Sequence, residues 1–154
     1  MRILIVAVGR AKAGPERALF DHYANRIIPP FSLDLKEVEE KRALPAPELK
    51  RREGELLMAQ VPGGATLIAL DERGKSMSSM DFSKKLGSWR DDGVRDVVFV
   101  VGGANGLDDP VRAKASLVMS FGAATWPHML VRGMLAEQVY RAQCILSGHP
   151  YHRE

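Results

Sequence analysis

The last six residues of the chain concentrate side chains that can stack on bases, hold phosphates and accept protons. They are His149-Pro150-Tyr151-His152-Arg153-Glu154, with one phenol ring, two imidazoles and one guanidinium. Aromatic and arginine side chains hold exposed RNA bases, and arginine also binds phosphate. Terminal residues usually fray, so an ordinary tail is the competing interpretation, and these six residues alone do not displace it.

A glycine-rich segment follows an apolar run in the second half of the chain. Gly102-Gly103-Ala104-Asn105-Gly106 comes directly after Val97–Val101. Glycine lets the backbone turn sharply and lets a ligand approach it without an intervening Cβ. The pattern matches neither the dinucleotide-binding fingerprint nor a P-loop, and on its own it also fits a simple turn.

A second loop, Gly122–His128, combines small residues with Trp126-Pro127. Small residues expose backbone N–H and C=O groups, which can recognise the edge of an adenine without charged side chains. Neither loop carries a cluster of cations, so the pair of loops favours an uncharged nucleoside over a phosphate-rich ligand. The alternative is an ordinary strand-to-helix connection in which Trp126 is packed.

Metal and nucleophile chemistry find little support in the sequence. The four histidines and the single cysteine show no metal-ligand spacing, so no metal is expected. No serine or cysteine nucleophile motif is present. Cys144 lies in an apolar stretch and has no second cysteine to pair with, which predicts a packed thiol.

The elements that would position these loops alternate between strands and helices. Three continuous apolar runs predict strands buried on both faces: Ile3–Val8, Thr66–Leu70 and Val97–Val101. Leu33–Val38 is predicted as a further strand, second along the chain. Helical patterns separate them, and the sequence therefore predicts an α/β fold with a mostly parallel sheet covered by helices on both faces. In such sheets ligands bind beyond the carboxyl ends of the strands, which here are the segments Leu70-Asp71-Glu72, Gly102–Gly106 and Gly122–His128.

The helix boundaries follow from capping and breaking residues. The stripe Leu19, Tyr23, Ile27 predicts a helix that begins after Pro15 and stops before Pro29-Pro30. Ser78 and Asp81 form a capping pair for a helix that ends near Asp91. A final helix carries an apolar stripe from Val131 to Leu146, and Gly148 is expected to end it.

Length and charge place few limits on function. The 154 residues suit one domain, 1–154, and a net charge of +3 with a pI near 9.2 is compatible with nucleic acid without indicating it. The charged run Lys50-Arg51-Arg52 is interpreted as a solvated helix face. The apolar run Ile3–Val8 is too short for a membrane span or a signal peptide, so a soluble cytoplasmic protein is expected.

Taken together, several motifs resemble the ribosomal large subunit methyltransferase H family. The resemblance covers essentially the whole chain and rests on the order and spacing of these segments: Ile5–Gly9, Val100–Gly106, Trp126-Pro127-His128, Leu130-Val131-Arg132, Glu137–Ala142 and His149–Glu154.

The resemblance implies a SPOUT methyltransferase, an α/β fold with a trefoil knot within about residues 100–154, which works as a homodimer. It implies transfer of a methyl group from S-adenosylmethionine to the N3 ring nitrogen of a pseudouridine in large-subunit ribosomal RNA, with S-adenosylhomocysteine as the product. Carried over by position, it places the cofactor against these residues: Leu70, Gly103, Gly122, Ala123, Ala124, Thr125, Trp126 and Pro127.

The resemblance also implies roles for the tail. Loss of the imide proton during attack benefits from a general base, and a free imidazole is mostly neutral at pH 7, so His152 is the preferred base. Arg153 and Arg132 would hold phosphate or polarise a carbonyl, and Tyr151 would stack on a base. In a dimer, the tail of one subunit would complete the pocket of the other.

Three other functions are considered. A non-enzymatic ribosome- or RNA-binding module would keep the fold without the cofactor, but the glycines and the tail are intact. A nucleotide- or NAD-dependent enzyme is disfavoured because the first turn, Val8–Lys12, lacks the pyrophosphate fingerprint. A SPOUT methyltransferase acting on transfer RNA is opposed only by the family tail and by the lack of an appended RNA-binding domain.

Overall fold

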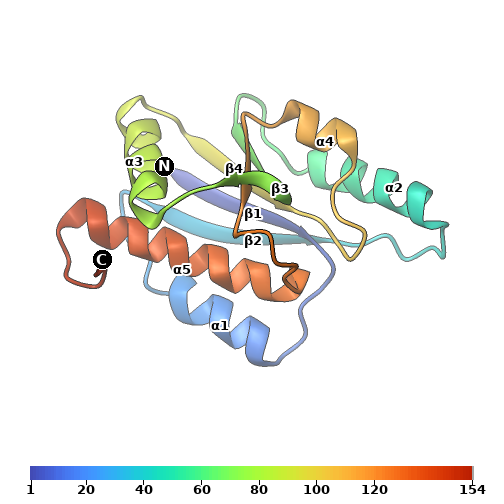
Figure 1. Cartoon of the computed structure of the whole chain (residues 1–154), viewed down its shortest axis with the longest axis horizontal. Helices are drawn as coiled ribbons and strands as arrows, with labels where there is room; N and C mark the ends of the chain where they lie inside the picture. The colour runs from blue at the N-terminus through green and yellow to red at the C-terminus, as the bar shows by residue number, and fades with distance from the viewer. Residues whose placement is uncertain (154) are drawn as a thin grey trace.

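The four segments predicted as strands become four of the five strands of one sheet. The structure is a computed structural model and describes residues 1–153. The strands are β1 (Arg2–Val8), β2 (Ser32–Val38), β3 (Thr66–Ser76), β4 (Asp96–Val101) and β5 (Leu117–Ser120). Their order is β2-β1-β4-β3-β5, and every described pair is parallel (Figure 1). The predicted parallel sheet is confirmed.

Helices cover both faces of this sheet because successive residues of a strand point to opposite sides. Ile3, Ile5 and Ala7 of β1 enter a core with α1 (Pro15–Ala24), α3 (Ser79–Asp91) and α5 (His128–Ser147). The alternate residues of β1 enter a second core with α2 (Ala46–Met58) and α4 (Asp109–Lys114). On the first face α5 packs against both α1 and α3 (Figure 1).

The helix ends mostly follow the predicted signals. Ser78 accepts a hydrogen bond from the backbone N–H of Asp81 at 3.1 Å, and Gly148 ends α5 with a left-handed φ of 76°. The first helix is shorter than predicted. It ends at Ala24, and Ile27 lies beyond it, because the chain tightens there into turns with hydrogen bonds to the third preceding residue.

Strand β3 is longer than the apolar run that predicted it. It continues past Leu70 to Ser76, and its register against β5 shifts between Leu70 and Lys75. Gly74 lies so close to the backbone of β5 that a Cβ on it would be 2.7 Å from the carbonyl carbon of Met119. Polar residues fill the displaced stretch, so alternation of apolar residues could not reveal it.

The connections open a crevice beside this irregular strand. The chain leaves β3 for α3 on one face of the sheet and leaves the neighbouring β4 for α4 on the other face. Where adjacent strands send their chains to opposite faces, a space opens beyond their carboxyl ends. The knot within about residues 100–154 stays a prediction, since strand order and pairing do not establish whether one segment of the chain passes through a loop formed by another.

Candidate active site

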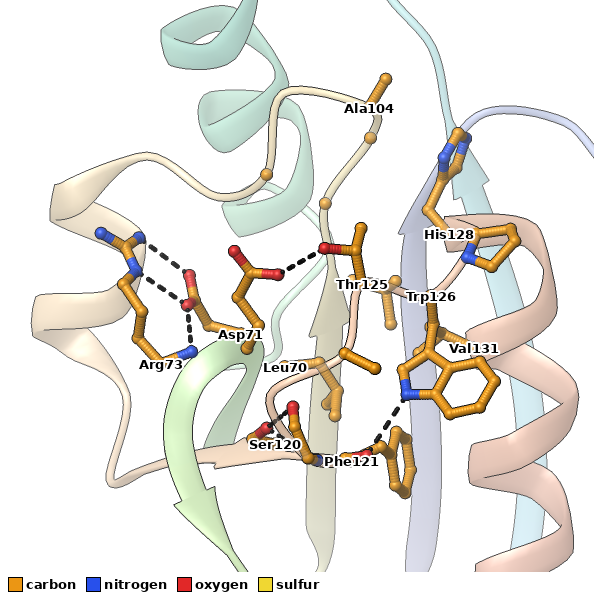
Figure 2. Close-up of a pocket in the computed structure, with 18 of the residues that line it drawn as sticks. Leu70, Asp71, Arg73, Ala104, Ser120, Phe121, Thr125, Trp126, His128 and Val131 are labelled. Carbon is orange, nitrogen blue, oxygen red and sulfur yellow. Dashed lines mark hydrogen bonds and ion pairs between the residues drawn. The ribbon is translucent and has the colours of Figure 1, made fainter.

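A cavity of about 700 Å³ lies in that crevice, within the size range of small-molecule sites (Figure 2). It is bounded by residues 70–73 after the first part of β3, by 101–106 after β4, and by the loop between β5 and α5. Predicted cofactor residues that line it are Leu70, Gly103, Gly122, Ala124, Thr125, Trp126 and Pro127. Ala123 belongs to the same loop but does not line the cavity.

The loop between β5 and α5 is held open by its own hydrogen bonds. The Ser120 hydroxyl donates to the carbonyl of Gly122 at 2.7 Å and accepts from its N–H at 3.0 Å. Gly122 has a φ of 102°, which favours glycine. Trp126 donates to the carbonyl of Phe121 at 3.2 Å and is 43% exposed, so the alternative of a packed Trp126 is wrong.

The glycine loop after β4 turns too tightly for side chains. A Cβ on Gly102 would be 2.6 Å from the backbone carbon of Gly106. A Cβ on Gly103 would be 3.0 Å from Val8 Cγ1 and 3.2 Å from the Oε2 atom of Glu53. The loop therefore rests directly on β1 and α2, and its backbone stays accessible from the cavity.

Glu53 is a residue that the sequence analysis missed. It is 8% exposed, and its Oε1 atom has no hydrogen-bond partner among the described residues. Burial raises the pKa of this carboxyl above its ordinary value. The only sequence sign is its place in α2 beside the buried residues Gly54 and Leu57.

Replacement of Glu53 by glutamine should stabilise the protein at neutral and alkaline pH. Because the folded-state pKa is raised, ionisation costs stability as the pH rises through that pKa, and the penalty vanishes below the unfolded-state value near 4.3. We expect Glu53→Gln to raise the Tm at pH 8 by about 2–4 °C. Thermal unfolding should show this gain shrinking to nothing near pH 4; an equal gain at both values would contradict the burial effect.

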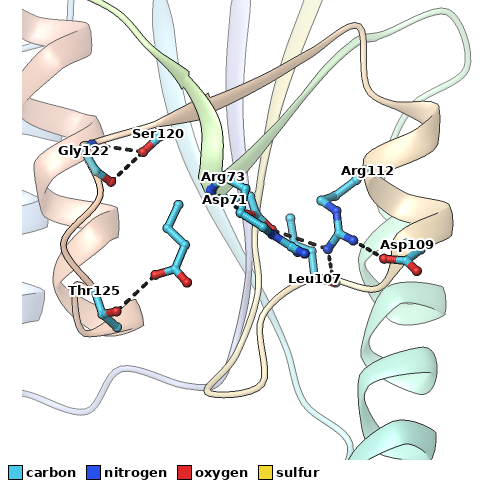
Figure 3. Close-up of polar contacts among 9 residues, drawn as sticks. Asp71, Arg73, Leu107, Asp109, Arg112, Ser120, Gly122 and Thr125 are labelled. Carbon is cyan, nitrogen blue, oxygen red and sulfur yellow. Dashed lines mark hydrogen bonds and ion pairs between the residues drawn. The ribbon is translucent and has the colours of Figure 1, made fainter.

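Asp71, which lines the cavity, is fully engaged in ion pairs. Arg73 donates to it at 3.0 and 3.1 Å, and Arg112 lies at 3.4 Å and also donates to the carbonyl of Leu107 (Figure 3). The hydrogen bond from Arg73 is the main cause that lowers the pKa of Asp71. This network ties the displaced part of β3 to α4.

Arg132 does not take the predicted position beside a phosphate. Its side chain is 2% exposed and donates to Glu37 at 2.6 Å and to the carbonyls of Val8 and Gly9 at 2.9 and 2.7 Å. Binding phosphate would require this buried guanidinium to break its ion pair and both carbonyl bonds, so the geometry opposes that prediction. The guanidinium instead fixes the ends of β1 and β2. His128, one turn earlier in α5, lines the cavity. Its burial is the main cause that lowers the pKa of His128, and the positive charge of Arg132 lowers that pKa further.

The tail lies beyond the C-terminal end of α5 (Figure 1), and none of its described residues lines the cavity of its own chain. The Tyr151 hydroxyl donates to Glu137 at 3.0 Å, and His152 Nδ1 lies 3.1 Å from Arg141. Glu137 and Arg141 follow Val131, the last residue of α5 that lines the cavity, by 6 and 10 residues, which is about 9–15 Å along the helix at 1.5 Å per residue. His152 Nε2 is buried without a partner among the described residues, and Arg153 is exposed. Glu154 lies outside the described residues.

The remaining predictions concern metal, thiol and charge. Within residues 1–153 no three histidine, cysteine or acidic residues gather as they would around a metal ion. Over the same residues no helix is long and apolar enough to span a membrane. Cys144 is buried, as predicted. Arg51 and Arg52 pair with Glu55, and Arg52 also pairs with Glu40, which agrees with a solvated helix face.

Comparisons with known proteins agree with this architecture. Residues 1–152 match the family described as "Predicted SPOUT methyltransferase". Ribosomal RNA large subunit methyltransferase H of Paramagnetospirillum magneticum is 59% identical over 153 residues, and that of Rhodospirillum centenum is 57% identical, each with 99% of both chains covered. A solved structure described as "Structural insights into the 2-OH methylation of C/U34 on tRNA" has a TM-score of 0.51 at 18% identity, covering 96% of this chain and 98% of the other, and shares the fold.

Proposed function

Because the chain belongs to the SPOUT methyltransferase family, we propose that it methylates a pseudouridine of large-subunit ribosomal RNA at ring N3, using S-adenosylmethionine. The substrate class follows the name of relatives that are 59% and 57% identical over the whole chain. The observation that carries the proposal is the cavity, where seven of the eight residues expected to hold the cofactor meet. Such an enzyme would act in the cytoplasm, where its ribosomal substrate is found.

The residues of the cavity fit a nucleoside-containing cofactor. Its glycine loop offers backbone without side chains, and the second loop offers small residues and the half-exposed ring of Trp126. Arg73, the one Lys or Arg that lines the cavity among the described residues, is paired with Asp71. When bound, S-adenosylmethionine supplies a methyl group on a sulfonium. The loops of this chain would orient that group and exclude water from it.

The proton that leaves the imide nitrogen needs an acceptor. We assign it to His152, whose Nε2 atom is buried without a partner in the tail. The side chains that hold the tail lie about 9–15 Å along α5 from the cavity-lining residue Val131, and His152 does not line the cavity of its own chain, which argues against action on the same chain. We therefore propose a homodimer in which the tail of one subunit completes the cavity of the other.

Two further tail residues would hold the RNA. Arg153 is exposed and is assigned to phosphate. The Tyr151 ring lies under the guanidinium of Arg141, 4.8 Å from the ring centre, and would stack on a base after turning away from it. Arg132 is omitted from these roles because it is buried in its ion pair with Glu37.

Methyl transfer from labelled S-adenosylmethionine tests the proposal. Purified ribosomes, free ribosomal RNA and transfer RNA are compared as substrates, and the methylated nucleoside is identified by mass spectrometry. We expect label in large-subunit RNA at a pseudouridine. Label in transfer RNA alone would assign a different substrate. No label in any of the three RNAs, whether or not the protein binds S-adenosylmethionine, would favour an RNA-binding module.

A further inference from the structure

Within the proposed cofactor site, on which this inference rests, we propose that Glu72 binds the ribose hydroxyls of the cofactor. Glu72 follows Leu70 and Asp71 at the irregular end of β3 and lines the cavity. Neither the family resemblance nor the sequence motifs assign it a role. The other two charged lining residues, Asp71 and Arg73, pair with each other, which leaves the carboxylate of Glu72 as the charged group without an ion-pair partner among the described lining residues.

The two neighbouring acids at this strand end have different partners. Asp71 is held by Arg73 and Arg112, which compensate its charge. Glu72 forms no ion pair among the described residues, and its recorded partner is the hydroxyl of Thr125 at 3.1 Å (Figure 3). Adjacent residues of an extended chain point to opposite sides, so one carboxylate faces α4 and the other faces the loop after β5. Both acids line the cavity, and the uncompensated one, Glu72, is the one that meets the loop after β5.

The bond to Thr125 shows what the Glu72 carboxylate accepts in this position. The donor is a neutral hydroxyl, carried by the loop whose small residues suit an adenine edge (Figure 2). A ribose attached to that adenine would bring two adjacent hydroxyls to the same side of the cavity. Acidic residues near strand ends bind ribose hydroxyls in other nucleoside sites, because a carboxylate can accept both O–H groups. The ribose would replace the Thr125 hydroxyl.

Calorimetric titration of Glu72→Gln with four ligands tests the inference. The ligands are S-adenosylhomocysteine, methylthioadenosine, which keeps the ribose but lacks the amino acid, and the 2′-deoxy form of each. We expect Glu72→Gln to weaken binding of both ribose ligands by about tenfold or more, as for hydrogen bonds to a charged group. In wild type the 2′-deoxy ligands should bind more weakly than their parents, and in Glu72→Gln this difference should largely vanish.

Glu48→Gln is the matched control, since it makes the same change at an exposed carboxylate of α2 that does not line the cavity. It should bind both ribose ligands as tightly as wild type. Loss of S-adenosylhomocysteine binding without loss of methylthioadenosine binding in Glu72→Gln would overturn the inference and assign the carboxylate to the ammonium group. Unchanged binding of both would also overturn it, whereas wild type that binds neither would refute the proposed cofactor itself. Equal Tm values would establish that the variants are folded.

Discussion

Gly103→Val is expected to abolish binding of S-adenosylmethionine and S-adenosylhomocysteine. The Cβ alone would approach Val8 Cγ1 to 3.0 Å and Glu53 Oε2 to 3.2 Å, and the two valine methyl groups would need further room in the same place. Both neighbours belong to packed elements, so the loop would move outward into the cavity instead. Calorimetry should show affinity reduced by about 100-fold or more, a loss typical of steric occupation of a packed site.

Two further glycine variants control for this effect. Gly63 has open space around its Cβ position and no positive φ, so Gly63→Val should bind the cofactor like wild type. Gly103→Ala adds the Cβ without the methyl groups and should show a smaller loss. Normal binding by Gly103→Val, with a wild-type Tm, would mean that the cofactor does not lie against this loop.

The sequence predicts the layers of this fold well because β1, β4 and the first part of β3 are buried on both faces. Continuous apolar runs such as Val97–Val101 have no other simple explanation, and β4 confirms that one. The extension of β3 escaped prediction because its residues are polar and its position depends on the contact of Gly74 with β5. The local composition of a segment indicates whether it is buried, but it does not indicate which other strand lies beside that segment.

The same distinction separates the predicted from the missed parts of the site. The loops 102–106 and 122–127 could be located because small residues follow strands, and strand ends meet at one edge of a parallel sheet. Glu53 could not be located, since it lies against the glycine loop at Gly103, which is distant in sequence. The role of Arg132 in holding RNA was wrongly predicted because the sequence reveals the charge of an arginine but not the residue it pairs with, which is here Glu37.

His152→Ala is expected to lower methyl transfer by about 10²–10⁴-fold, the usual contribution of a general base. Binding of S-adenosylhomocysteine should stay near the wild-type value, because the residues expected to hold the cofactor belong to the loops of one chain and His152 is assigned to the proton of the RNA base. The measurements are single-turnover transfer to ribosomes and calorimetric titration of the cofactor product. Equal losses of transfer and binding would contradict a role in proton transfer.

A mixed dimer tests whether His152 acts on the neighbouring subunit. When His152→Ala and Gly103→Val chains are co-expressed with different tags and purified through both, each dimer has one intact cavity and one intact tail. If the tail completes the cavity of the other subunit, those two parts meet in one site, and about half of the wild-type rate should return. If each tail serves its own chain, no site is complete and the mixed dimer stays inactive. The separation of about 9–15 Å along α5 between Val131 and the side chains that hold the tail favours recovery, since His152 does not line the cavity of its own chain.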